Sequence, residues 1–327
     1  MRSACLTLVN RPGSTLPDVL ELLTDAAFRR HVLERHVPHP MLARVWADYD
    51  QLTPGAQAQL NAPLVSRLRG VLSRQLARDL LGSPASTIEL SEVLDGGILI
   101  ARLPKGELGE DTARLLGSLV LAGVWAHTTR RSRIPQEARP DATVIVDEAH
   151  NFLHLPLGMD DTLAESRGYR VSWVIAHQHL GQLPVDVRDA VDANGRNKLI
   201  FTVSPSDAQR LARHVGPHFD EYDLARRPAF SMTARILHNG NNQPAFTLDT
   251  LPLPPPIPGR AHTLQAAARA RSGMLVALRQ ALAARMAVTG SSRLFTQPDR
   301  PTPALPAADT DGRDRPVHYA AGPHHET

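Results

Sequence analysis

Two adjacent carboxylates and an amide follow apolar runs in the middle of the chain. Asp147 and Glu148 come directly after Val144–Val146, and Gln178 follows a second apolar run. Polar residues at the carboxyl ends of parallel strands lie where ligands bind in open α/β sheets. There an aspartate can hold Mg²⁺, usually through water, and a neighbouring glutamate can orient or deprotonate an attacking water. The amide of a glutamine both donates and accepts, so it suits contact with a terminal phosphate or its water.

This pattern is the Walker B arrangement, but the same residues also have structural interpretations. An acidic pair can end a strand and begin a helix, and a glutamine can be an ordinary loop residue. The phosphate-binding sequence G-x-x-x-x-G-K-[ST] would settle the matter, yet the chain has no Gly-Lys pair, since Lys105 follows a proline and Lys198 an asparagine. We expect the phosphate loop upstream of Met1, in a longer gene product, or on a separate chain; a degenerate relative without the loop is the third explanation.

The elements that would position these residues alternate between strand and helix. Apolar runs predict strands at Gly97–Leu103, Ala142–Val146, Val171–Ala176 and Lys198–Val203. Intervening helical stretches indicate βαβ units and a parallel sheet covered on both faces. A hairpin is expected over 229–249 because an Asn-Gly pair separates two strand-like runs.

The flanking regions differ from this core in composition. Residues 1–84 predict a helical region, including one helix over Thr53–Leu81 with leucines at every fourth position along one face. A Pro-rich linker is expected at 251–260, an Ala/Arg-rich helix at 261–289 and a disordered tail at 290–327.

Composition excludes several classes of protein. Apolar residues make up 42% of the 327, which is ordinary for a globular chain. The net charge of +3 is compatible with nucleic acid without being diagnostic. Cys5 is the only cysteine, so a disulfide framework or multi-cysteine zinc site within the chain is excluded. The absence of a signal peptide and of a spanning segment predicts a cytoplasmic setting.

Four segments together resemble a known superfamily. They are GGILIARLPKGELGEDTARLLGSLV (96–120), TVIVDEAHNF (143–152), LAESRGYRVSWVIAHQHLGQLP (163–184) and ANGRNKLIFTVSPSDAQRLA (193–212). In order and spacing they are similar to the HerA/FtsK superfamily, and most of all to the TraG/TraD-type coupling ATPases of conjugative DNA transfer and type IV secretion. The resemblance covers roughly 85–215. It implies an α/β fold with a RecA-like ATPase core at 85–250, preceded by an all-α insertion at 1–84.

The resemblance also implies roles and partners. Asp147 matches the magnesium aspartate, Glu148 the catalytic glutamate and Gln178 the strand-end glutamine. Arg167 matches an arginine that reaches the neighbouring subunit's nucleotide, and Arg196 is a second candidate. Either can instead be a solvated helix end, and that interpretation has more weight for Arg196. The implied ligands are ATP, Mg²⁺ and DNA. The implied partners are further copies in a hexameric ring, or a separate chain bearing the phosphate loop, with relaxase and secretion components at the inner face of the membrane.

Two other functions stay open at this stage. The chain can be a truncated or degenerate relative that no longer hydrolyses ATP and acts as a binding or structural subunit. It can also be a nucleic-acid-binding adaptor that works through the basic helix at 261–289, which contains four arginines and no acid.

Overall fold

The computed structural model describes residues 1–36, 39–153, 158–275, 277–278 and 281. These residues belong to one compact unit, Met1–Gly290. The predicted tail at 290–327 and the end of the predicted Ala/Arg helix lie outside the described residues.

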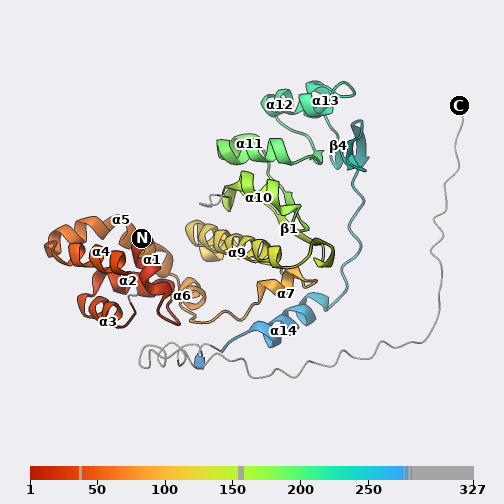
Figure 1. The fold of residues 1–327 in the computed structure, drawn as a ribbon. Coiled ribbons are helices and arrows are strands. Elements are labelled where there is room, and N and C mark those ends of the chain that lie inside the picture. The colour runs from red at the N-terminus through yellow and green to blue at the C-terminus, as the bar shows by residue number, and fades with distance from the viewer. Residues whose placement is uncertain (37–38, 154–157, 276, 279–280, 282–327) are drawn as a thin grey trace, which may run out of the picture. The chain divides into compact units, whose positions relative to one another are not determined.

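The N-terminal part of the described chain is helical (Figure 1). Its helices are α1 (Arg2–Val9), α2 (Leu16–Thr24), α3 (Ala26–His36), α4 (Pro40–Asp50), α5 (Pro54–Leu72) and α6 (Gln75–Leu81). α2 begins with a capping box, in which the Thr15 N–H donates to Asp18 Oδ2 at 2.6 Å. Leu22, Val32 and Trp46 are among the buried residues of the core that these helices share.

The predicted single helix over Thr53–Leu81 is wrong, because the structure has two helices there. α5 ends at Leu72, and the backbone of Arg74 is extended before α6 begins. The Arg78 guanidinium donates to the carbonyls of Leu72 and Ser73 at 2.6 and 2.7 Å, so it satisfies acceptors that the end of α5 leaves open. Leu76 on α6 is 48% exposed, so the leucine face is not buried throughout.

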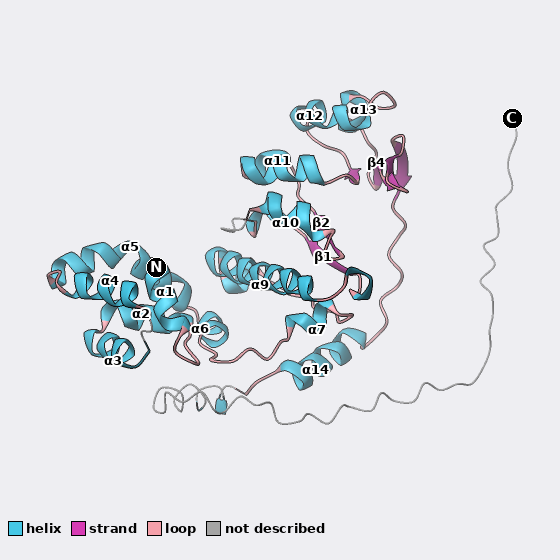
Figure 2. Ribbon diagram, viewed as in Figure 1, coloured by secondary structure: helices cyan, strands magenta, loops and turns pink. Residues whose placement is uncertain are grey.

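The rest of the described chain contains both helices and short strands, which alternate from β1 to α12 (Figure 2). The elements are α7 (Leu90–Leu94), α8 (Lys105–Leu108), α9 (Glu110–Arg130), β1 (Ala142–Val146), α10 (Met159–Ser166), β2 (Val171–Ile175), α11 (Val185–Asn194), β3 (Lys198–Ile200), α12 (Pro205–Val215), α13 (Glu221–Ala225), β4 (Ser231–Arg235), β5 (Leu237–His238), β6 (Asn241–Asn242), β7 (Phe246–Asp249) and α14 (Arg260–Ser272).

β1 and β2 form a two-stranded parallel sheet, with Ala142 opposite Val171 and Val146 opposite Ile175. One face packs into a cluster that includes residues of α9, α10 and α11, to which the strands contribute Val144, Val146, Trp173 and Ile175. On the other face Ile145 is 71% and Val174 is 48% exposed. The expectation that helices cover both faces is therefore wrong for the described residues.

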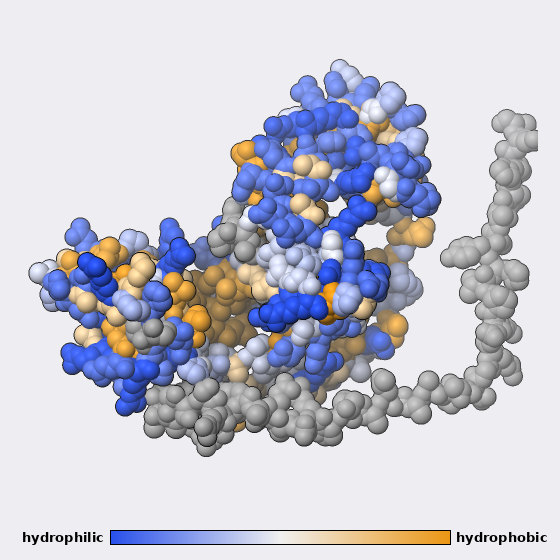
Figure 3. Space-filling view, in the orientation of Figure 1, coloured by the Kyte–Doolittle hydropathy of each residue, from blue (hydrophilic) through white to orange (hydrophobic). Residues whose placement is uncertain are grey.

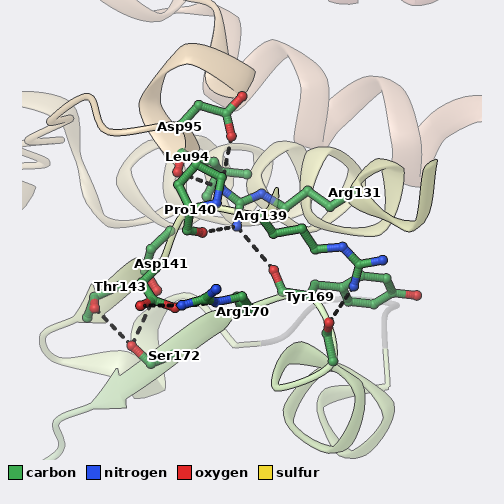
Figure 4. Close-up of polar contacts among 12 residues, drawn as sticks. Leu94, Asp95, Arg131, Arg139, Pro140, Asp141, Thr143, Tyr169, Arg170 and Ser172 are labelled. Carbon is green, nitrogen blue, oxygen red and sulfur yellow. Dashed lines mark hydrogen bonds and ion pairs between the residues drawn. The ribbon is translucent and has the colours of Figure 1, made fainter. Parts of the chain in front are cut away.

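The amino ends of β1 and β2 are held by Arg131, a buried residue just after α9 (Figure 4). Its guanidinium donates to the carbonyls of Leu94 at 2.6 Å, Pro140 at 2.9 Å and Tyr169 at 3.1 Å, and to the carboxylate of Asp95 at 3.0 Å. One cation thus ties the end of α7 to the starts of both strands.

The other predicted strands differ from the structure. Gly97–Leu103 forms no strand, and Ile98 and Ile100 are 90% and 85% exposed. The run has strand composition, but no strand pairs with it among the described residues, and a strand needs such a partner. β3 covers only Lys198–Ile200 and pairs antiparallel with β4, not with the parallel sheet. β4 also pairs with β7, and the short pair β5–β6 carries the predicted Asn-Gly turn.

The predicted fold class is confirmed: the chain is α/β, with a small parallel sheet flanked by helices. Among the described helices, none is long and apolar enough to cross a membrane. α14 buries no residue, and its only ion pair in the described structure joins Arg271 to Glu92 at 2.8 Å. Scattered hydrophobic patches appear among hydrophilic residues on the visible face (Figure 3).

Candidate functional site

The acidic pair lies directly beyond the carboxyl end of β1. Glu148 has a left-handed backbone, with φ of 49°, which is uncommon for a residue other than glycine. Its carbonyl accepts both the backbone N–H and the side-chain amide of Asn151, each at 3.0 Å. The next residue, Ala149, donates its N–H to the carbonyl of Ala176 at 2.9 Å, which ties the loop to the end of β2.

Glu148 and Gln178 meet across the ends of the two strands. The Gln178 side-chain amide donates to Glu148 Oε1 at 2.6 Å, and the Glu148 side chain is 42% exposed. Gln182 fixes the loop that carries Gln178, because its Oε1 accepts the N–H groups of Gln178 and His179 at 3.3 Å each. The structure therefore brings together two of the residues predicted from the sequence.

Asp147 lies beside them and is exposed. Its Oδ1 accepts the N–H of Glu148 at 2.9 Å, and its other oxygen has no hydrogen bond among the described residues. No group of three or more His, Cys, Asp or Glu residues in the described part of the chain is arranged to hold a metal ion. Mg²⁺, however, commonly takes one or two carboxylates and completes its shell with water and phosphate oxygens. Asp147 fits such a role.

Two histidines and a buried aspartate complete the surroundings of the pair. His150 Nδ1 lies 3.6 Å from Glu148 Oε2, so this imidazole faces the oxygen that Gln178 leaves open. Burial lowers the pKa of His177, and the nearby Asp207 opposes that shift only in part. Asp207 accepts the N–H of Leu180 at 2.9 Å, which anchors the loop after β2 to the start of α12.

The two predicted arginines lie away from this cluster. Arg167 follows α10 and precedes β2, so it is exposed at the amino end of the strand whose carboxyl end leads to Gln178. A five-residue strand spans about 16 Å. Arg196 precedes β3 and donates to the carbonyl of Gly240 at 3.2 Å. Neither guanidinium has a contact with Glu148 in the described structure.

Sequence reasoning missed Asn151, Lys105 and Asp207. Lys105 Nζ donates to Asn151 Oδ1 at 2.7 Å across 46 positions of sequence. Asn151 is 2% exposed, and its amide donates to Glu148 as described above. Only the fold brings these residues together, and no motif or spacing in the sequence indicated it.

The fold is that of a class of solved proteins, the conjugative coupling proteins. The bacterial conjugative coupling protein TrwBdeltaN70, in its unbound monoclinic form, matches with a TM-score of 0.50 and 14% identity, over 76% of this chain and 60% of that one. The plasmid coupling protein TrwB in complex with ADP and Mg²⁺ matches with a TM-score of 0.51 and 16% identity, over 76% of this chain and 62% of that one.

The likeness is one of structure. No family model matches the chain, and no curated protein matches it in sequence. The chain spans about three fifths of the length of the coupling proteins above, 60% and 62%. The plasmid coupling protein has also been solved with a non-hydrolysable ATP analogue, and that structure has a TM-score of 0.50 and 15% identity.

Proposed function

We propose that this chain carries the Walker B half of the nucleotide site of a DNA-translocating ATPase of conjugative transfer, within the HerA/FtsK superfamily. The observation that carries the proposal is the 2.6 Å hydrogen bond between Gln178 and Glu148 at the carboxyl ends of paired parallel strands. That edge is where open α/β sheets bind ligands. The likeness of fold to conjugative coupling proteins supports the choice of DNA transfer as the process served.

Each residue has a role in the proposed reaction. Asp147 would hold Mg²⁺, which would supply positive charge beside the phosphates of ATP. Glu148 orients and deprotonates the water that attacks the terminal phosphate. The Gln178 amide contacts the terminal phosphate or that water, because it can donate to one and accept from the other. When ATP binds, the Gln178 side chain must therefore leave the Glu148 carboxylate, or a water molecule must enter beside the two side chains.

The phosphate loop is proposed to come from outside these residues, on a longer form of the polypeptide or on a second chain. Both lysines of the chain have other partners: Lys105 contacts Asn151, and Lys198 donates to the carbonyls of Asp192 and Gly195 at 3.4 and 2.9 Å. The bare face of β1–β2, with Ile145 and Val174 exposed, supports further strands and helices joining the sheet.

Arg167 and Arg196 are proposed to act on the nucleotide of a neighbouring copy. Neither contacts Glu148 of its own chain in the described structure, so a role in neutralising phosphate requires a second subunit. A closed ring, hexameric by resemblance, would supply it around DNA. Contacts with relaxase and secretion components at the membrane belong to the same proposal.

The proposal is tested by phosphate release from ATP with Mg²⁺, with and without DNA. The chain is assayed alone and with the phosphate-loop-bearing polypeptide. Glu148→Gln is expected to lower DNA-stimulated release at least 100-fold, because an amide cannot accept the proton. Glu165→Gln, on the exposed surface of α10, is the matched control and should leave the rate unchanged. Equal rates in both variants would contradict the proposal.

A second candidate function is that of a non-hydrolysing subunit on the same scaffold. The absence of a Gly-Lys pair and the prior engagement of both lysines favour it. On this alternative, the chain associates with the active ATPase and the Glu148→Gln variant supports hydrolysis as well as the unchanged chain does.

A further inference from the structure

A chain of hydrogen bonds leads from Lys105 to the main-chain carbonyl of Glu148. Lys105 Nζ donates to Asn151 Oδ1 at 2.7 Å, and Asn151 Nδ2 donates to the Glu148 carbonyl at 3.0 Å. Gln178 then donates to the Glu148 carboxylate at 2.6 Å. Three segments far apart in the sequence thus meet at one acidic residue.

The two ends of this chain of hydrogen bonds are fixed to different degrees. Lys105 begins α8, whose Leu108 is 3% exposed in a cluster with Ala113 and Leu116 of α9. Asn151 is itself 2% exposed. Glu148, in contrast, has its carboxylate at the surface and a backbone conformation that a residue with a Cβ rarely adopts. Such a conformation persists only where the surroundings hold it.

The charge of Lys105 has an unusual partner. Among the described residues no carboxylate forms an ion pair with its ammonium, which contacts the amide oxygen of Asn151 instead. An ammonium on that oxygen draws electron density from the amide and makes its N–H groups stronger donors. The bond from Asn151 to the Glu148 carbonyl is thereby strengthened.

We propose that Lys105 and Asn151 are positioning residues that hold the Glu148 main chain in its left-handed conformation and so keep its carboxylate on Gln178. The ammonium of Lys105 acts through Asn151 and touches no substrate. The inference rests on the proposed function and extends it, because it states which residues position the carboxylate of Glu148, the proposed base. The effect of Lys105 and Asn151 on the contact between Glu148 and Gln178 concerns only the geometry of this chain, so it can be tested without measuring hydrolysis.

The test follows the side-chain amide resonances of Gln178 by NMR in the 327-residue chain. Glu148→Ala gives the positions of those resonances when the contact is lost. Lys105→Met keeps the aliphatic stem without the charge, and it is expected to move the resonances at least halfway toward the Glu148→Ala positions. Lys105→Arg should restore them, because a guanidinium also donates to an amide oxygen.

A second variant separates the two bonds of Asn151. Asn151→Asp has nearly the same shape and can still accept from Lys105, but it cannot donate to the Glu148 carbonyl. It should displace the Gln178 resonances as Lys105→Met does. Arg102→Met is the control: this arginine is 79% exposed on the segment before α8, and its loss should leave the resonances in place.

Unchanged Gln178 resonances in both Lys105→Met and Asn151→Asp would overturn the inference. Equal displacement in Lys105→Arg and Lys105→Met would also overturn it, because the charge would then not be responsible. Failure of the proposed ATPase is distinguishable: the resonances would respond as expected while Glu148→Gln left phosphate release unchanged.

Discussion

The two ends of the β1–β2 sheet are built differently, although the same strands form both. At the amino end the buried Arg131 donates to three carbonyls and one carboxylate, and Arg170 pairs with Asp141 at 2.7 Å (Figure 4). At the carboxyl end the Glu148 carboxylate accepts from the Gln178 amide and is 42% exposed. Its left-handed backbone does not set this end apart, because Arg170 at the amino end has a φ of 57°. Near Glu148, the Nδ1 atoms of His150 and His177 are buried without a hydrogen-bond partner.

This difference indicates that one end of the small sheet stabilises the fold and that the other end is the candidate reactive site. Charged hydrogen bonds to main-chain oxygens fix the amino end, although Arg131 Nε is itself buried without a partner. Removing Arg131 would leave one buried and two part-buried carbonyls without this donor. Left-handed backbone and an unpartnered buried nitrogen occur at both ends, so neither feature distinguishes them. The difference is that the carboxyl end carries the adjacent carboxylates of Asp147 and Glu148, at the edge where open α/β sheets bind ligands. The amino end therefore holds the strands, and the carboxyl end is the part available to a ligand.

The largest expected effect is that of removing Arg131, which should destabilise the amino end of the sheet. Arg131→Met leaves the carbonyls of Leu94, Pro140 and Tyr169 without this donor, so we predict a loss of about 3 kcal/mol in the free energy of unfolding. Urea unfolding measures it. Arg133→Met, at an exposed position two residues on, should change the value by less than about 0.5 kcal/mol. Similar losses in the two variants would contradict the role of Arg131.

At the carboxyl end we predict a change of opposite sign in the free energy of unfolding. Glu148→Gly removes the penalty of a left-handed conformation, and we predict a gain of about 1 kcal/mol in the free energy of unfolding, less the cost of a more flexible unfolded chain. Proposed hydrolysis should be lost in the same variant. Both variants are compared by calorimetry, with Glu165→Gly in the last turn of α10 as the control, which should be destabilised. A destabilised Glu148→Gly protein would mean that the site is held for structural reasons.

The smallest effect is a pH dependence at the carboxyl end. Burial lowers the pKa of His177 below its ordinary value of 6.5, so the unfolded chain takes up this proton first as the pH falls. The contribution of neutral His177 to the free energy of unfolding is fully present above pH 6.5, and it is lost as the pH falls from there toward the lowered pKa.

His177→Asn should reduce that slope between pH 7 and 5, measured by urea unfolding at several pH values. His214 contributes in the same direction, because burial lowers its pKa as well, so part of the slope should persist. His238→Asn, at an exposed position, is the control. An unchanged slope in His177→Asn would contradict the prediction, because it would mean that the pKa of His177 is the same in the folded and unfolded chains.

The two parallel strands, and the contact between Glu148 and Gln178, can be predicted from the local sequence. β1 was predicted at its observed bounds, and β2 differs by one residue, because apolar β-branched runs between helices favour buried parallel strands. The meeting of Glu148 and Gln178 follows from the rule that parallel strands share one carboxyl edge.

The remaining features depend on contacts that no local pattern specifies. Residues 97–103 have strand composition, but a ladder needs a partner, which the described chain does not supply. The break between α5 and α6 depends on Arg78 meeting two carbonyls. Lys105 and Asn151 are joined only because α8 packs beside the acidic loop.

The most direct test of the difference between the two ends is hydrogen exchange with and without Mg²⁺ and a non-hydrolysable ATP analogue. The chain is measured alone and with the polypeptide that bears the phosphate loop. We predict new protection at 147–153 and 177–182 in the complete assembly, and unchanged exchange at 139–143 and 168–172. Protection at the amino end, or none at the carboxyl end in an assembly that binds the nucleotide, would contradict the assignment of the site.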